Sequence, residues 1–538
     1  MMSPLTYIMG LPLAMALILA VVPSEKRQFF RWGARMATLG SLLLAIYVFS
    51  AFDPPITDQP GPLPAQGTEE SALENEYGYK FTQRVEWIPS LNIHYYVGVD
   101  GIGIVMVLMA ALVAFAATCC AQEIRTREKE FYILLLLMTG GILGAFMSLD
   151  IFLMYFLHEL ALVPTFIMIG VWGRGQDKDF AAYKITLYLS LGALLTLAGV
   201  IMLYLQFGSF SLLSMMDHGT QFAGTEAGTF SVTEQNVIFA LLMFGLGILV
   251  GLWPFHTWAP LGYSAAPTAT AMMHAGVIKK FGLFMLIRVA LPLLPEGAAE
   301  WMPVLAWLCL GNLLYCGLVA MRQKDLNQLL GNSSVAHMGF VFLGIASLTT
   351  IGLNGAVMVM VAHGLLAALA FGLSGHLYTH ARTLEMDKVT GLLRTMPFWG
   401  TALMMALFAG CGLPGFANFV GELTVFFGAW EVSALESSTD HPLAGHQLQF
   451  RVITILGVWG ALVIGAVYML RAIRQLLHGK RPELAAAAPD ITGWRRVPFA
   501  VLLGVLLAFG FFPGLITEKI TQATRAIATL ALPADTTK

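Results

Sequence analysis

Long apolar runs alternate with short polar turns along almost the whole chain. A helix needs about 20 apolar residues to cross the hydrocarbon of a bilayer. Open strands cannot satisfy their backbone in lipid, so we expect no extended sheet. The pattern predicts an all-α polytopic membrane protein with about fourteen transmembrane helices, near residues 5–22, 34–52, 99–121, 131–148, 151–172, 182–206, 236–255, 266–292, 301–321, 329–349, 352–378, 396–429, 450–472 and 497–515.

Three polar segments are longer than the rest. Residues 53–98 are rich in proline and acidic side chains, and residues 207–235 and 430–449 have little helical pattern. Successive loops lie on alternate sides of the membrane. The side that carries these three segments and the C-terminal tail has six of the 30 Lys and Arg, and the opposite side has 21. The other three lie within spans. Cytoplasmic loops carry the excess of positive charge. We therefore predict that both termini and the three polar segments face outward.

Composition excludes several classes of function. Hydrophobic residues make up 57% of the chain and charged residues 12%, about half the charge of a soluble protein. The sequence has no GxxxxGK[ST] loop for a nucleotide, no basic patch for nucleic acid and no His or Cys cluster with metal-ligand spacing. Its five cysteines lie in apolar segments without a CxxC pair, which is typical of packing residues. We therefore expect no cofactor on this chain. The first apolar run is interpreted as a spanning helix, not a cleavable signal.

Ionisable side chains nevertheless occur inside the predicted spans. The run "DIFLMYFLHELALVPTFIMIGVW" contains Glu159 beside His158, although a carboxylate at mid-membrane costs about 2.5–3.5 kcal/mol. A single buried His can be a packing residue, but acids and lysines at depth usually mark ion or proton paths. Together these groups predict one polar axis through the bundle, drawn from Glu159, Lys279, Lys280, His337, His363, His376 and Glu422.

Two of the predicted helices look broken. Span seven ends in "GLWPFHTWAP" and span twelve contains "CGLPGFANF". Either break alone could be a simple proline kink. Because the breaks lie five spans apart, they favour two inverted five-helix repeats, as in many transporters. The predicted division is 1–130, with helices 1–3, then 131–292 and 301–472 as the repeats, then 473–538 with an inner loop, helix 14 and an outer tail.

Five motifs together resemble one family: "FLHELALVP", "WPFHTWAPLGYSAAPTATAMMHAGVIKKFG", "LLGNSSVAHMGFV", "VAHGLLAALAFGLSGHLY" and "LPGFANFVGELTVFFG". They look like the antiporter-like subunits of respiratory complex I, and among these the M-type chains. An L-type chain would be longer, and an N-type chain usually has Lys in place of Glu422. The resemblance implies a proton-translocating subunit of a bacterial inner-membrane NADH–quinone oxidoreductase. NADH, flavin, iron–sulfur clusters and quinone would lie on partner subunits, beside L-type and N-type antiporter-like chains.

The resemblance also implies a role for individual residues. Glu159 is similar to the essential glutamate of span five, and Lys280 to the central lysine of span eight. His256 stands in the P-F-H motif after the break. His337 and His363 resemble the polar residues that link two half-channels. Glu422 resembles the terminal titrating group.

The sequence departs from the family at one important position. The family has a lysine five residues before the proline of P-F-H, and Leu249 stands there. Lys279 is an extra cation beside Lys280. Adjacent helical residues point about 100° apart. We therefore hypothesise that Lys279 turns toward span seven and partly replaces the missing charge; alternatively, it faces a partner subunit or snorkels. Asn327 and Gln328 also stand where Lys and Arg are common.

Two other functions share these motifs: a subunit of a multi-subunit cation/proton antiporter, and the membrane arm of an ion-pumping hydrogenase. An independent solute transporter is disfavoured because the sequence offers no polar site of substrate size.

Overall fold

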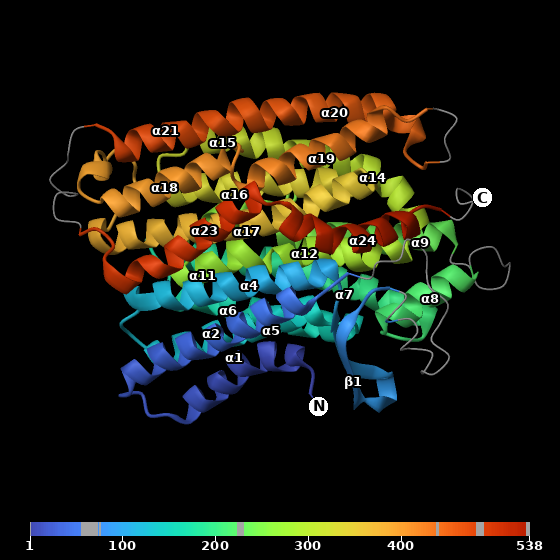
Figure 1. Cartoon of the computed structure of the whole chain (residues 1–538), viewed down its shortest axis with the longest axis horizontal. Coiled ribbons are helices and arrows are strands. Elements are labelled where there is room, and N and C mark those ends of the chain that lie inside the picture. Colours follow the sequence, from blue (N-terminus) through green and yellow to red (C-terminus); the bar gives the residue numbers. More distant parts are fainter. Residues whose placement is uncertain are drawn as a thin grey trace.

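The computed structural model describes residues 2–54, 74, 77–222, 231–436, 441–479 and 489–533. Lys480, Arg481 and Lys538, and parts of the three long polar segments, lie outside the described residues. Figure 1 shows long helices lying side by side along one axis of the molecule.

The chain is built almost entirely from α-helices. Their bounds are α1 Pro4–Val21, α2 Arg27–Ala51, α4 Gly101–Cys120, α5 Glu128–Met147, α6 Ile151–Trp172, α7 Lys178–Phe207, α8 Leu212–Phe222, α9 Val232–Val250, α10 Trp258–Ala265, α11 Thr268–Met273, α12 Lys280–Met285, α13 Leu291–Leu293, α14 Pro295–Leu310, α15 Gly317–Arg322, α16 Leu326–Ala346, α17 Thr350–Ala381, α18 Pro397–Gly410, α19 Ala417–Ser433, α20 Gln447–Trp459, α21 Ala466–Leu477, α23 Val497–Phe511 and α24 Gly514–Leu530. Wider π-helical turns join some of these helices end to end, at His274–Ile278, Leu286–Ala290, Gly311–Cys316 and Gly460–Gly465.

Twelve helices in the described part of the chain are long and apolar enough to cross a membrane. The predicted spans 266–292 and 396–429 are not among them, because each is interrupted. The first is interrupted at Lys279, a turn residue between the π turn His274–Ile278 and α12, and the second by the non-helical segment between α18 and α19. The all-helical membrane fold is confirmed, whereas the count of fourteen is not.

Two predictions for the polar segments were wrong. Lys80–Ile88 (β1) and Ile93–Val99 (β2) form an antiparallel hairpin, although no sheet was expected. The argument against strands applies only within lipid, and this hairpin lies in the long polar segment. Residues 207–235 were predicted to have little helix, but α8 occupies Leu212–Phe222. Beyond the predicted last span, α24 makes the tail helical.

The described chain termini lie at one end of the bundle, and most of the basic loops lie at the other. The backbone N–H of Ser3 donates to Gln83 Oε1 of β1 at 2.8 Å, and Lys519 of α24 donates to the carbonyl of Phe52 at 2.6 Å. The described termini therefore lie at the end that carries the hairpin and α8 (Figure 1). We call this the hairpin end, and the opposite end, where most of the Lys- and Arg-bearing loops lie, the basic end.

The centre of the bundle is formed by α16 and α17. In both helices the most apolar stretch is wholly buried inside the protein. Helix α17 packs against α16, α19 and α4. A polar side chain on either central helix is therefore surrounded by other helices rather than by lipid.

Candidate functional site

Lys280 begins a row of neighbouring polar side chains at the centre of the bundle. It lies at the start of α12, after the π turn His274–Ile278, and is fully buried. Its Nζ lies 2.9 Å from Nδ1 of His363 on α17 and donates to the carbonyl of Ala275 at 2.5 Å. Lys280 and His363, which the sequence placed in different repeats, are therefore in direct contact.

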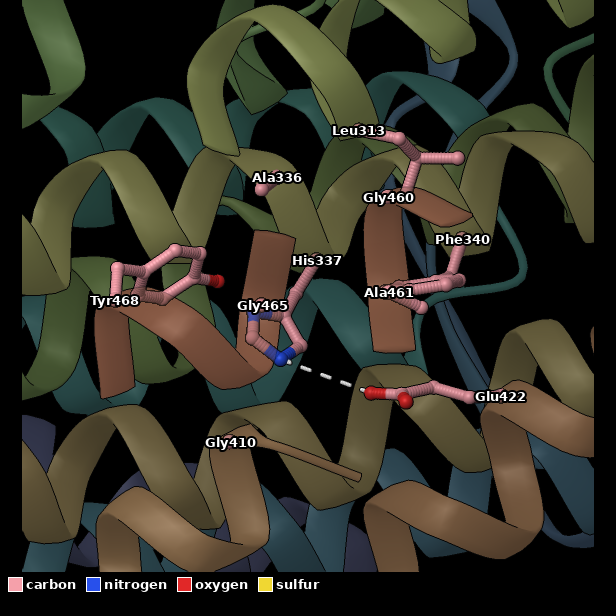
Figure 2. Close-up of a pocket in the computed structure, with 10 residues that line it drawn as sticks. All are labelled: Leu313, Ala336, His337, Phe340, Gly410, Glu422, Gly460, Ala461, Gly465 and Tyr468. Carbon is pink, nitrogen blue, oxygen red and sulfur yellow. Dashed lines mark ion pairs between the residues drawn. The ribbon is translucent and has the colours of Figure 1, made fainter. Parts of the chain in front are cut away.

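His337 of α16 continues these contacts toward Glu422 of α19. Its ring centroid lies 5.4 Å from that of His363. Nδ1 of His337 lies 2.7 Å from the carbonyl oxygen of Ser333, which can only accept, so Nδ1 carries the proton. Nε2 is then left facing Glu422, 3.6 Å from Oε1 (Figure 2). The sequence predicts that Glu422 faces the bundle interior, because it stands eight residues, or about two helical turns, after Pro414. The Glu422 carboxylate does point into the bundle.

Two small cavities adjoin these residues. One of about 10 Å³ is lined by His337, Glu422 and Tyr468 (Figure 2), and another of about 20 Å³ by Ser333, His337 and His363, among other residues. A volume of about 10–15 Å³ accepts the centre of one water molecule. Each cavity therefore has room for about one water, which could bridge the gaps between His363, His337 and Glu422.

The break in span twelve makes room for the Glu422 carboxylate. Helix α18 ends at Gly410 and α19 begins at Ala417. Between them Gly412 has a φ of +67°, which side chains other than glycine rarely adopt. A Cβ at Gly412 would stand 2.6 Å from Oε2 of Glu422. Glycine is thus needed here both for the turn and for the space beside the acid.

Glu159 has different surroundings at the other end of the predicted axis. On α6, its Oε1 lies 3.4 Å from Nδ1 of the neighbouring His158, and its side chain is 27% exposed. The His158 ring stacks on Phe281 of α12 at a centroid distance of 3.9 Å. The ring of Phe281, which follows Lys280 on α12, thus covers one face of the His158 ring.

Lys279 does not turn toward Glu159. Its ammonium donates to the carbonyl of Ser334 on α16 at 3.0 Å and to the hydroxyl of the same residue, and lies 5.7 Å from the ring of Tyr263. Among the described residues, Lys279 forms no ion pair. The hypothesis that it replaces the missing charge at Leu249 is therefore wrong for this structure, because its ammonium is held by α16. His158 approaches Glu159 instead.

The break in span seven is held by a side chain that sequence reasoning missed. Asn312, fully buried in the π turn Gly311–Cys316, accepts from the backbone N–H of Trp253 at 2.7 Å. Its amide donates to the carbonyls of Gly251 at 3.0 Å and Val335 at 3.1 Å. It thereby ties the break to α16. An asparagine inside the apolar run "LCLGNLLYC" was the signal that could have revealed it.

His256 lies in this break, 5% exposed, with its ring 5.6 Å from that of Tyr315. Its Nδ1 is buried without a hydrogen-bond partner. His376 lies near the basic end of α17, where Nε2 is 3.2 Å from the carbonyl of Pro489. Within the part of the chain that the structure describes, neither histidine is hydrogen-bonded to Lys280 or His363. The predicted residues thus separate into a connected group, Lys280, His363, His337 and Glu422, and isolated members.

Within the described residues, no group of three or more His, Cys, Asp or Glu is arranged to hold a metal ion. All five cysteines are free thiols, three of them buried.

The amino-acid sequence is similar to membrane subunits of quinone oxidoreductases. Residues 148–439 match a family described as the NADH:quinone oxidoreductase/Mrp antiporter transmembrane family. The chain is 32% identical over 97% of its length to NAD(P)H-quinone oxidoreductase chain 4 1 of Synechococcus elongatus, covering 91% of that protein. It is 30% identical to NADH-quinone oxidoreductase subunit M of Rhodobacter capsulatus, covering 97% of this chain and 95% of the relative.

Solved structures show the same fold. A chain of respiratory complex I from Thermus thermophilus with bound NADH superposes with a TM-score of 0.81 at 25% identity, covering 98% of this chain and 99% of that one. A chain of the Mrp complex from Dietzia sp. gives a TM-score of 0.76 at 19% identity and covers 98% of this chain, but only 52% of its own length is matched.

Proposed function

Because the chain belongs to the NADH:quinone oxidoreductase/Mrp antiporter transmembrane family, we propose that it is the M-type, proton-translocating membrane subunit of an NADH–quinone oxidoreductase. Its work is proton transport, and electron transfer takes place on partner subunits that hold NADH, flavin, iron–sulfur clusters and quinone. Other antiporter-like subunits of the L and N types lie beside it in the membrane.

The length of the match favours this function over an antiporter of the Mrp kind. The relatives named as quinone oxidoreductase chain 4 or subunit M are matched over more than nine tenths of their length. The Mrp chain is matched over about half, and the chain of the membrane-bound sulfane sulfur reductase over 77%. Sequence identity also supports the M-type subunit, at 32% and 30% for these two relatives against 19% and 20% for the other two chains.

The buried group Lys280, His363, His337 and Glu422 carries the proposal. Burial favours the neutral form of both acids and bases, whereas a nearby opposite charge favours the ionised form. A change of charge at Lys280 therefore alters the protonation of His363, 2.9 Å away, and then of His337 and Glu422. A proton would leave or enter at Glu422. Glu159, with His158, would sense charge on the side of the neighbouring subunit.

The remaining residues have proposed roles of their own. His256, in the break of span seven, would relay protons in the first repeat, and Lys279 would set the electrostatic field beside Lys280. The repeats are proposed to be 131–292 and 301–472. In support, the chain crosses the bundle in opposite directions at the two breaks: from α9 it runs toward the basic end, where α11 lies, and from α18 to α19 it runs toward the hairpin end (Figure 1).

Purification of the tagged chain with its partners tests the function. We expect the redox subunits of a quinone oxidoreductase together with L-type and N-type chains. Recovery of only small antiporter subunits, or of a nickel–iron hydrogenase, would overturn the proposal and identify the alternative.

Location is proposed as the bacterial inner membrane, with the hairpin end and both termini in the periplasm. The excess of Lys and Arg at the basic end supports this orientation. A reporter fused after the last residue should be active only if it folds in the periplasm. Activity only in the cytoplasm would reverse the orientation.

A further inference from the structure

Arg35 is a buried cation that none of the described acids neutralises. It lies on α2, eight residues after the helix begins at the basic end, and is 7% exposed. Its Nε is buried without a hydrogen-bond partner. A buried charge without a counter-charge is strongly unfavourable. The site therefore calls for an anion.

The neighbouring acid is already engaged. Glu128 of α5 accepts two hydrogen bonds from Arg31, each of 2.8 Å, and lies 4.0 Å from Arg27. A carboxylate held in this two-bond geometry is satisfied by its own arginine. Arg35, one helical turn further along α2, has no such partner among the described residues.

A second unsatisfied donor accompanies Arg35. The hydroxyl of Tyr132 on α5 is buried without a hydrogen-bond partner, and the residue is 1% exposed. Helix α5, which carries Tyr132, packs directly against α2, which carries Arg35. Two buried donors on adjacent helices indicate a ligand rich in acceptor oxygens.

Two tryptophans flank the guanidinium. The Arg35 Cζ lies 5.3 Å from the ring of Trp32 and 4.7 Å from the ring of Trp494, which lies in the short 3-10 helix Gly493–Arg496 before α23. Both tryptophans are about half exposed on the outside of the bundle. Tryptophan is enriched at the level of lipid headgroups. The neighbouring Phe29 and Met36 are also exposed, as a lipid-facing surface requires.

From these contacts we propose that Arg35 and Tyr132, flanked by Trp32 and Trp494, bind the phosphate of an anionic phospholipid in the leaflet next to the basic end. The guanidinium and the phenol donate to phosphate oxygens, and the indoles line the entry from the membrane. The planar guanidinium of an arginine matches the geometry of a phosphate better than the ammonium of a lysine does. The inference is independent of the proposed proton path, since Arg35 does not contact its residues.

Photo-crosslinking on the purified complex tests the site. The complex, in nanodiscs of phosphatidylcholine, is exposed to a photoreactive phosphatidylglycerol, and the labelled peptides of α2 and residues 489–496 are quantified by mass spectrometry. We expect labelling that unlabelled phosphatidylglycerol displaces, whereas phosphatidylcholine and inorganic phosphate do not. Arg35→Gln should weaken binding about tenfold, because a charge-assisted hydrogen bond is lost.

Tyr132→Phe removes only one hydroxyl and should weaken binding by about threefold without disturbing the fold. Arg394→Gln, at an exposed arginine of the basic end, is the matched control and should leave labelling unchanged. Equal labelling of wild type and Arg35→Gln would overturn the proposal, as would competition by inorganic phosphate. Absence of labelling in the wild-type complex would also overturn it and would point to an acid of a neighbouring subunit as the partner of Arg35.

Discussion

Glu422 and Glu159 lie at opposite ends of the buried polar residues, and they are paired differently. Glu422 is nearly buried and faces His337, which continues through His363 to Lys280. The Glu159 side chain is 27% exposed, and its one ion-pair contact within the described residues is with the adjacent His158. The two proposed repeats therefore both contain a broken helix, but the neighbouring titratable groups extend from Lys280 to Glu422 and do not include Glu159.

The residues beside the two helix breaks explain this difference. In the first repeat the position before the break is Leu249, and Phe281 covers the ring of His158. In the second, glycine at 412 makes room for an acid next to a water-sized cavity. A proton can move only between groups within hydrogen-bonding reach or joined by water. The second repeat satisfies this condition more fully.

The largest expected effect comes from Glu422. Glu422→Gln keeps the size of the side chain but removes its ability to exchange a proton, so proton translocation should fall on the order of tenfold or more. Translocation is measured by quenching of a pH dye in proteoliposomes. Glu431→Gln, at an exposed position of the same helix, should translocate normally. Equal rates in the two variants would remove Glu422 from the path.

Lys279 and Lys280 provide the next comparison. Lys280→Met removes the contact with His363 and should lower proton translocation about tenfold, whereas Lys279→Met removes the bonds to Ser334 and the contact with the Tyr263 ring. We expect the second variant to keep most of its activity and to lose stability instead. A greater loss of translocation in Lys279→Met, in fully assembled complex, would contradict the assignment.

His337 should give an intermediate effect. His337→Gln retains a polar side chain but not a titrating one, and the adjoining cavities allow water to replace part of the link. A fall of about fivefold in the translocation rate is expected. His380→Gln, near the basic end of α17, is the control. A fully active His337→Gln would mean that water alone carries the proton between His363 and Glu422.

The two helix breaks should respond differently to loss of an asparagine. Asn312→Leu leaves the carbonyls of Gly251 and Val335 and the N–H of Trp253 without their partner, and should destabilise the protein by about 2–3 kcal/mol. Asn418, in the other break, is buried with both amide atoms unpartnered, so Asn418→Leu should be nearly neutral. Thermal unfolding of the purified complex distinguishes these outcomes, and equal shifts would refute the comparison.

The smallest effect is expected from Leu249→Lys. It restores a cation to the first repeat and should raise the number of protons translocated per electron by less than twofold, since only one of the complex's channels is altered. The ratio of dye response to NADH oxidation in proteoliposomes measures it. An unchanged ratio would mean that the His158–Glu159 pair already completes the first half-channel.

Much of this arrangement could be predicted from the sequence. The apolar runs gave the helical fold, because lipid forces each span to satisfy its own backbone. The resemblance supplied Lys280, His337, His363 and Glu422 as members of one site. The spacing of Glu422 after Pro414 gave its inward direction.

Other features depend on packing that periodicity does not encode. A π turn ends directly before Lys279, and the Lys279 ammonium is held by Ser334 of α16; neither feature follows from ideal helical spacing. Asn312 acts through backbone groups of residues distant in the sequence, which no local pattern reveals. The β-hairpin was missed because an argument valid in lipid was extended to a polar segment.

The central claim, that Lys280 and Glu422 belong to one proton path, is tested most directly by combining their substitutions. Proton translocation per NADH is measured in proteoliposomes for Lys280→Met, Glu422→Gln and the double variant, with assembly checked by NADH–quinone activity. If the two residues act in series, the double variant will be no worse than the poorer single variant. If the losses multiply as for independent sites, the two residues act on separate paths and the account is contradicted.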